Sequence, residues 1–212
     1  MQNEIIVAGF GGQGVLLAGA LLAQAAVEQG LHTTWFPAYG AEMRGGTANS
    51  TVLVSSDEIG SPLAFHPNAL IAMNEPSLNK FMPRMIDGSI IIANSSIIPQ
   101  DKEFKIKPIF VPVTDIADKE ISNIKTANFV AVGALIKALE LYADSNCAPD
   151  ERPQKQRQSA DEEGDTCDLN DTKILTLESA FAACEKAFTA KPELIEMNKK
   201  ALKAGYNYVT TK

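Results

Sequence analysis

The sequence predicts an α/β protein with three layers, in which a doubly wound, mostly parallel sheet lies between helices. Two observations favour this fold class. Short apolar runs alternate with helical stretches along the chain, and the first run leads through a glycine-rich loop directly into a long apolar helix. That order of strand, loop and helix is typical of the first unit of a Rossmann-like domain.

In this first unit, a strand over Glu4–Ala8 is expected to precede the loop, and a helix is expected over Val15–Gln29 with Gly30 as its C-cap. Glycines let the backbone approach a ligand closely, and the free N–H groups of a helix start favour an anion. The loop is therefore a candidate phosphate cradle, made of Gly9, Gly11, Gly12, Gln13 and Gly14.

The later elements follow from the spacing of apolar residues. Strands are predicted over residues 33–36, with an end at Pro37, and over 47–54, 70–73, 90–94 and 109–113. Helices are predicted over 75–85, 126–142, 177–188 and 192–204. Gly205 is expected to stop the last helix, which leaves a tail over Tyr206–Lys212.

Composition excludes several classes of function. The chain has 212 residues and a hydrophobic content of 45%, enough for a single domain over residues 1–212 with one generous core. A net charge of −7 argues against nucleic acid as the main partner. No apolar run is long enough for a membrane span, and no secretory signal is evident at Met1, so a cytoplasmic location is expected.

The second half of the chain contains an acidic stretch and all three cysteines. The stretch from about 144 to 171 is acidic and has almost no large apolar residue, so it is predicted to be a flexible insertion inside the domain. Cys147, Cys167 and Cys184 are widely spaced and form no metal-binding motif, so free thiols are expected and no metal site is predicted.

A nicotinamide cofactor is one possible ligand of the glycine loop. Such sites normally have a carboxylate at the end of the second strand to hold the ribose, but the first candidate here is Glu42, and Glu28 lies inside the first helix. A second possibility is that Gly9, Gly11 and Gly14 permit a tight turn and close packing without any ligand. Both alternatives stand beside binding of another anion.

A second loop follows Pro37 and ends near Asn49. Arg44 could bind a phosphate or carboxylate there, or could pair with Glu42 and only shape the loop. No pair of nucleophile and base is recognisable, since His32 and His66 are expected to be surface or capping residues. No catalytic residue is therefore predicted in this chain.

Taken together, the two loops resemble those of a known family. The segments Gly9–Gly19 and Tyr39–Asn49, with Ile59–Pro62 and Met73–Leu78, are similar to the gamma subunit of 2-oxoacid:ferredoxin oxidoreductases. The likeness extends from Ile5 to about Tyr142 and resumes more weakly in the C-terminal helices. The acidic stretch has no counterpart in this pattern.

The resemblance implies one subunit of an enzyme complex that converts a 2-oxoacid to its acyl-CoA and is inactive as a single chain. Thiamine diphosphate and iron–sulfur clusters would be held by alpha and beta subunits, with a ferredoxin-like delta subunit in some complexes and ferredoxin as acceptor. The two loops would help to cover coenzyme A. The corresponding residues are the glycine-loop positions together with Tyr39, Glu42, Arg44, Gly45, Gly46 and Asn49.

The resemblance also favours 2-oxoglutarate, or a branched-chain oxoacid, over pyruvate as the substrate of the complex. The alternative function is a free-standing nucleotide-binding oxidoreductase with a Rossmann-like domain, and a structural subunit with an empty glycine loop is a third possibility.

Overall fold

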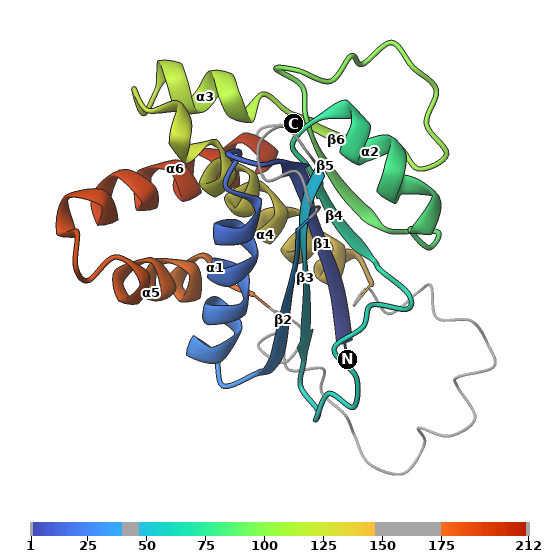
Figure 1. Ribbon diagram of the computed structural model, residues 1–212, viewed down its shortest axis with the longest axis horizontal. Coiled ribbons are helices and arrows are strands. Elements are labelled where there is room, and N and C mark those ends of the chain that lie inside the picture. The colour runs from blue at the N-terminus through green and yellow to red at the C-terminus, as the bar shows by residue number, and fades with distance from the viewer. Residues whose placement is uncertain (1, 40–46, 147–174, 211–212) are drawn as a thin grey trace.

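A six-stranded sheet with the order β2-β3-β1-β4-β5-β6 forms the middle layer of the computed structural model (Figure 1). The structure describes residues 2–39, 47–146 and 175–210. Antiparallel pairing joins β3 to β1 and to β2, whereas the pairs β1–β4, β4–β5 and β5–β6 are parallel. Five strands therefore run in one direction, which confirms the predicted α/β fold with a mostly parallel sheet. The strands are β1 (Gln2–Phe10), β2 (His32–Tyr39), β3 (Thr47–Ser55), β4 (Ala69–Ala72), β5 (Ile90–Asn94) and β6 (Ile109–Val111).

Helices cover both faces of the sheet (Figure 1). One face carries α1, α3, α4, α5 and α6, and the other carries α2 and the 3₁₀ turn that follows it. The helices are α1 (Val15–Glu28), α2 (Glu75–Phe81), α3 (Val113–Lys119), α4 (Ala127–Asn146), α5 (Leu177–Ala187) and α6 (Pro192–Thr210), with 3₁₀ turns over Met82–Arg84 and Ile124–Thr126.

The two cores follow from the alternation of side chains along the central strands. In β1, Ile5 and Val7 pack under α1 and α4, whereas Ile6 and Ala8 pack toward α2. The strands β4 and β5 are apolar at every position except Asn94 and are fully buried, as expected for parallel strands covered on both faces. The predicted strand over 90–94 has these bounds in the structure.

The end of α1 also agrees with its prediction. Gly30 has φ +74°, the N–H of Leu31 donates to the Ala26 oxygen, and the N–H of Gly30 donates to the Val27 oxygen. These bonds form a Schellman-type cap, which turns the chain sharply into β2.

Two predicted boundaries at Pro37 and Gly205 are wrong. The strand β2 continues through Pro37 to Tyr39, which is possible because β2 is an edge strand, paired on one side with β3. The helix α6 continues through Gly205 to Thr210, because this glycine lies against the backbone of α4 rather than at a helix end. The tail predicted from Tyr206 is therefore helical as far as Thr210.

Smaller differences occur at three other places. The strand predicted over 109–113 ends at Val111, and a seven-residue helix, α3, begins at Val113. The helix predicted over 75–85 becomes a 3₁₀ turn after Phe81. The acidic insertion predicted from about 144 lies mostly outside the described residues and stays a prediction, but residues 144–146 belong to α4.

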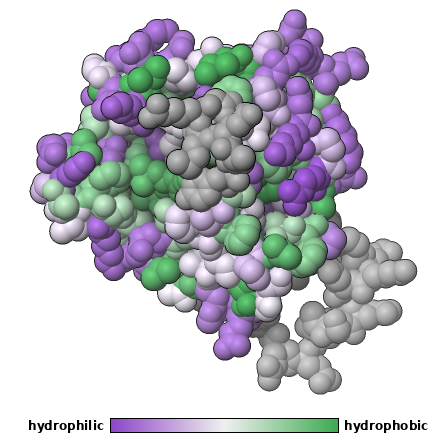
Figure 2. All heavy atoms as spheres, viewed as in Figure 1, coloured by the Kyte–Doolittle hydropathy of each residue, from purple (hydrophilic) through white to green (hydrophobic). Residues whose placement is uncertain are grey.

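The surface mixes apolar and hydrophilic side chains on the face seen in Figure 2, where apolar residues gather left of the centre and hydrophilic ones toward the rim. Large apolar side chains with at least 40% of their surface exposed include Trp35, Phe36 and Phe65. In the described parts of the chain, no helix has the length and apolar character needed to cross a membrane.

Candidate functional site

The glycine loop connects the end of β1 to the start of α1 at the carboxyl edge of the sheet. The N–H of Gln13 donates to the Phe10 oxygen over 3.1 Å and closes a tight turn. Gly12 has φ +99° and Gly14 has φ +72°, and Gly14 precedes α1 without a side-chain cap. The first N–H groups of α1 therefore have no capping side chain, as an anion-binding helix start requires.

The inner side of this turn is filled by the side chain of Gln13. Its Oε1 accepts from the Phe10 N–H over 2.7 Å and from Asn74 Nδ2 over 2.8 Å, and its Nε2 donates to the Met73 oxygen over 3.4 Å. A Cβ at Gly9 would lie 2.7 Å from Gln13 Oε1. Gly9 is therefore required for internal packing, and the Phe10 N–H is not available to a ligand.

The far end of the loop is fixed by Asn128, in the first turn of α4. Asn128 is 2% exposed, and its Nδ2 donates to the Gly14 oxygen over 3.1 Å. A Cβ at Gly14 would lie 2.6 Å from that nitrogen. This contact joins the starts of α1 and α4, so the loop has a fixed position relative to both helices.

A pocket of about 240 Å³ opens beside the loop. Gly12 is exposed on this side, and a Cβ added to it would have no atom within 4 Å. Thr114, at the start of α3, accepts from Asn94 Nδ2 over 2.9 Å, and Lys125 lies in the turn before α4. The pocket thus lies where the carboxyl ends of parallel strands meet helix starts, the usual ligand position in an open α/β sheet. It is lined by Gly12, Gln13, Met73, Ile97, Thr114, Ile124, Lys125 and Ala127.

Comparison with known proteins shows which family has this sequence. The sequence pattern described as pyruvate ferredoxin/flavodoxin oxidoreductase matches residues 4–151, which include the glycine loop and every residue that lines the pocket. The chain belongs to this family. The family resemblance of the two loops is thereby confirmed.

Two curated relatives differ in how much of their length is matched. The ketoisovalerate oxidoreductase subunit VorA of Methanothermobacter marburgensis is 42% identical over 135 residues, which are 64% of this chain and 28% of VorA. The 2-oxoglutarate synthase subunit KorC of the same organism is 34% identical over 145 residues, which are 65% of this chain and 78% of KorC. The chain thus matches little more than a quarter of VorA but most of KorC.

Two solved structures share the fold. The gamma subunit of a keto/oxoacid ferredoxin oxidoreductase from Geobacter sulfurreducens has a TM-score of 0.73 at 21% identity, with 99% of both chains covered. The 2-oxoglutarate:ferredoxin oxidoreductase from Magnetococcus marinus, with 2-oxoglutarate, coenzyme A and succinyl-CoA bound, has a TM-score of 0.74 at 19% identity. It is matched over 100% of this chain and 31% of its own.

The structure brings together some of the residues predicted to bind a cofactor. Gly9, Gly11, Gly12, Gln13 and Gly14 form one loop, and Asn49 and Tyr39 lie at the same edge of the sheet, because Asn49 pairs with Ala8 of β1 and Tyr39 ends β2. Glu42, Arg44, Gly45 and Gly46 lie outside the described residues.

The position of β3 makes the surroundings of the loop differ from those of a usual nicotinamide site. In a dinucleotide-binding domain the second strand pairs directly with the first, and its carboxylate reaches the ribose. Here β3 lies between β1 and β2, so the end of β2 is two strand spacings, roughly 10 Å, from β1. A carboxylate at Tyr39 would therefore be displaced from the usual position.

Sequence reasoning missed Asn128, Thr114 and Lys125. These residues lie 100 or more positions after the glycine loop, and each is unremarkable in its local sequence. One signal could have pointed to the region: Asn123 caps the following turn by accepting from the Lys125 N–H over 3.0 Å. That cap marks the start of α4, which in a parallel α/β fold begins at the carboxyl edge of the sheet.

The described residues contain no obvious nucleophile or metal centre. Cys184 is fully buried, and this burial raises the pKa of its thiol to about 11, so the unreactive protonated form prevails at neutral pH. His32 and His66 are exposed, as predicted for surface positions. Among the described residues no three His, Cys, Asp or Glu side chains are grouped closely enough to hold a metal ion.

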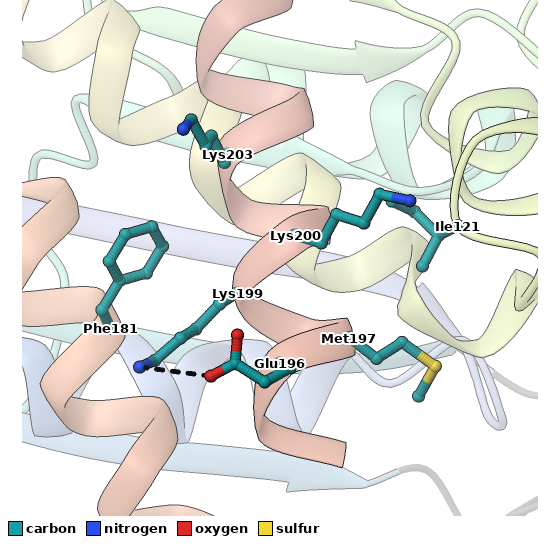
Figure 3. Close-up of a pocket in the computed structure, with 7 residues that line it drawn as sticks. All are labelled: Ile121, Phe181, Glu196, Met197, Lys199, Lys200 and Lys203. Atoms are coloured by element: carbon teal, nitrogen blue, oxygen red, sulfur yellow. Dashed lines mark ion pairs between the residues drawn. The ribbon is translucent and has the colours of Figure 1, made fainter. Parts of the chain in front are cut away.

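A second, more open groove of about 600 Å³ lies between α5, α6 and the turn after α3 (Figure 3). Its three lysines do not make it a comparable anion site. Lys199 is paired with Glu185 and Glu196, and Lys200 donates to the Glu120 oxygen over 3.1 Å. Two of the three ammonium groups are therefore engaged by the protein itself. The groove is lined by Ile121, Phe181, Glu196, Met197, Lys199, Lys200 and Lys203.

Proposed function

We propose that this chain is the gamma-type subunit of a 2-oxoacid:ferredoxin oxidoreductase, in a complex that oxidatively decarboxylates a 2-oxoacid to its acyl-CoA. The observation that carries the proposal is the 34% identity to KorC over 78% of its length. The family match over residues 4–151 supports it, because that range includes both the glycine loop and the later helix α4. Alpha and beta subunits, and a ferredoxin-like delta subunit in some complexes, would hold the thiamine diphosphate and iron–sulfur clusters.

Exposed apolar side chains support the expectation of partners. Leu17 on α1, Phe36 on β2 and Phe65 in the loop between β3 and β4 are 39%, 50% and 66% exposed. Apolar surface of this kind often marks protein–protein contacts. In the complex we expect part of it to be covered by the partner subunits, in the cytoplasm.

Co-purification tests this proposal. The chain is expressed with the products of neighbouring genes, and the purified material is assayed for reduction of ferredoxin by a 2-oxoacid and coenzyme A. We expect activity from the complex and none from the chain alone. Oxidation of NADH by the isolated chain would instead support the free-standing oxidoreductase.

For the substrate we favour 2-oxoglutarate. This preference is supported by the Met73–Leu78 segment, by the loop with Glu42 and Arg44, and by the match to KorC at comparable length. A branched-chain 2-oxoacid is the second candidate, because VorA has the higher identity of 42%. Rates of the complex with 2-oxoglutarate, 2-oxoisovalerate and pyruvate at equal concentration decide between them.

We further propose that the two loops help to bind coenzyme A. The support is the uncapped start of α1, the open side of Gly12, and the placement of Tyr39 and Asn49 at the same edge. Arg44 would add a bidentate contact to a phosphate. Calorimetry of coenzyme A binding to the complex, with and without Arg44→Ala, tests this role, and an unchanged affinity would favour a structural loop.

A further inference from the structure

The strands β1 and β4 end side by side, and the helices that follow them lie on opposite faces of the sheet (Figure 1). Their last parallel pair is Ala8 with Ala72, and the N–H of Met73 donates to the Ala8 oxygen over 2.8 Å. Beyond this point the chain leads from β1 through the glycine loop to α1, and from β4 to α2. In an open α/β sheet, the place where such connections diverge is where ligands usually bind.

One side chain joins the two diverging connections. Asn74 is 1% exposed and is the N-cap of α2, where its Oδ1 accepts from the Ser77 N–H over 2.9 Å. Its Nδ2 donates to Gln13 Oε1 in the glycine loop over 2.8 Å. Because the helix cap takes the oxygen, Asn74 presents its nitrogen to Gln13, and its two partners determine the orientation of its amide.

The amide of Gln13 is held at both ends by the turn between β4 and α2. Asn74 donates to its Oε1, and the Met73 oxygen accepts from its Nε2 over 3.4 Å. The Met73 oxygen also accepts from the buried Asn94 Nδ2 over 3.3 Å. Gln13 Oε1 accepts in addition from the Phe10 N–H over 2.7 Å, at the start of the glycine loop. The position of the loop therefore depends on the turn before α2.

We infer that Asn74 is a positioning residue for coenzyme A, which acts through Gln13 to hold the glycine loop in place. The assignment of coenzyme A as the ligand rests on the proposed function. Asn74 is buried, so it acts through the loop and not by contact with the ligand. Loss of its nitrogen should weaken the use of coenzyme A by the complex and leave the use of the 2-oxoacid unchanged.

The test replaces the nitrogen of Asn74 and keeps the cap of α2. Asn74→Asp retains an oxygen for the Ser77 N–H, because aspartate is a good N-cap, but it places a carboxylate oxygen against Gln13 Oε1. Two acceptors then face each other without a hydrogen between them, and Gln13 has to move. Asn74→Ser is the second variant, because serine also caps helices well and removes the nitrogen without adding a charge.

Asn68, at the opposite edge of the sheet, provides the matched control. Its Oδ1 accepts from the Glu4 N–H over 2.9 Å, and its Nδ2 donates to Asn3 Oδ1 over 2.7 Å. Asn68→Asp therefore makes the same change between the same two kinds of partner, a backbone N–H and the oxygen of a side-chain amide. It does so near the amino ends of β1 and β4, away from the glycine loop.

Each variant is assembled into the complete complex, and the rate of 2-oxoacid oxidation is measured against the concentration of coenzyme A and then of the 2-oxoacid. We expect the KM for coenzyme A to rise about tenfold in Asn74→Asp and about threefold in Asn74→Ser. The kcat and the KM for the 2-oxoacid should stay within about twofold of wild type, because the partner subunits would hold the reacting groups. Asn68→Asp should leave both KM values within about twofold of wild type.

Hydrogen exchange of the full chain reads the position of the loop directly. The Phe10 N–H should exchange faster in both Asn74 variants, because Gln13 Oε1 no longer accepts from it in a fixed position, and at the wild-type rate in Asn68→Asp. If Asn74→Asp does not assemble into the complex, Asn74→Ser decides the outcome.

An unchanged KM for coenzyme A in the Asn74 variants would overturn the inference, even if the Phe10 N–H exchanged faster. An equal rise of this KM in Asn68→Asp would also overturn it, because the effect would then be general destabilisation. A wild-type chain that forms no active complex would overturn the proposed function and with it the role of Asn74. An active wild-type complex whose KM for coenzyme A does not respond to Asn74 would overturn the inference alone.

Discussion

Glycine has contrasting roles at the start of α1 and between α4 and α6. Between the two helices, a Cβ on Gly133 would lie 1.9 Å from the backbone oxygen of Leu202, and a Cβ on Gly205 would lie 1.9 Å from that of Val130. A Cβ on Gly12 would have no neighbour within 4 Å. The same residue type therefore serves close packing in one region and an open surface in the other.

The glycine loop itself contains both roles. Gly9 and Gly14 are packed against Gln13 and Asn128, respectively, whereas the side of the loop at Gly12 faces a pocket. A G-x-G-x-x-G spacing thus predicts a tight turn of the backbone, but it does not indicate which of the glycines face a ligand.

The largest effect is expected from Gly205→Ala. Within a helix this change normally stabilises by up to about 1 kcal/mol. Here the new methyl group would overlap the backbone of α4, so we expect the free energy of unfolding to fall by about 3 kcal/mol. Urea unfolding followed by circular dichroism measures the difference.

Gly60→Ala is the control for this prediction, because a Cβ at Gly60 would have no neighbour within 4 Å. Its effect should lie within about 0.5 kcal/mol of zero. If Gly205→Ala had the same free energy of unfolding as Gly60→Ala, the result would contradict the close contact between the backbones of α4 and α6.

Gly14→Ala should cost somewhat less, about 2 kcal/mol. Part of the cost comes from φ +72°, and part from the 2.6 Å approach to Asn128 Nδ2. The second part can be separated by a double-mutant cycle with Asn128→Ala, which removes the amide. The two changes should be less destabilising together than the sum of their separate effects, and strict additivity would contradict the packing role of Gly14.

Gln13→Ala is expected to cost about 1–2 kcal/mol, because it removes the acceptor of the Phe10 N–H and of Asn74. Gln24→Ala is the comparison: Gln24 donates to Glu28 one turn later within α1, and loss of this bond should cost less than about 0.5 kcal/mol. Thermal unfolding of both variants measures the difference, and equal melting temperatures would argue that Gln13 does not hold the loop.

Much of the fold could be predicted because the relevant signals are local. Apolar runs marked β1, β4 and β5, and Gly30 marked the end of α1. The wrong boundary predictions at Pro37 and Gly205 have one cause. Proline usually ends a strand and glycine usually ends a helix, but the tertiary position of each residue here removes the energetic cost of continuing the element. Pro37 lies in an edge strand, and Gly205 lies in a contact that no larger residue could make.

The site was less predictable because it is assembled from distant parts of the chain. The glycines were recognisable from their spacing, but the residues that distinguish the packed side from the open side are Gln13, Asn128 and Lys125. The placement of β3 between β1 and β2 is a property of the topology, and no local pattern in residues 47–55 indicates which strands it separates.

Gly12→Ala is expected to destabilise about as much as Gln13→Ala, and it is the sharpest test of the open side of the loop. A Cβ here meets nothing, so the cost is the conformational penalty of φ +99°, about 1–2 kcal/mol. Gly30→Ala shares the positive φ and the open surroundings but lies at the opposite end of α1. The two variants should therefore unfold at similar denaturant concentrations.

Their ligand binding should differ, because Gly12 lines the pocket and Gly30 does not. An added methyl group at Gly12 takes space beside Lys125, so binding of coenzyme A to the full chain should weaken in Gly12→Ala and stay at the wild-type level in Gly30→Ala. Equal binding of coenzyme A by both variants would mean that the open side of the loop binds no ligand. The loop glycine Gly12 and the packed glycines of α4 and α6 would then differ only in how much their substitution destabilises the fold.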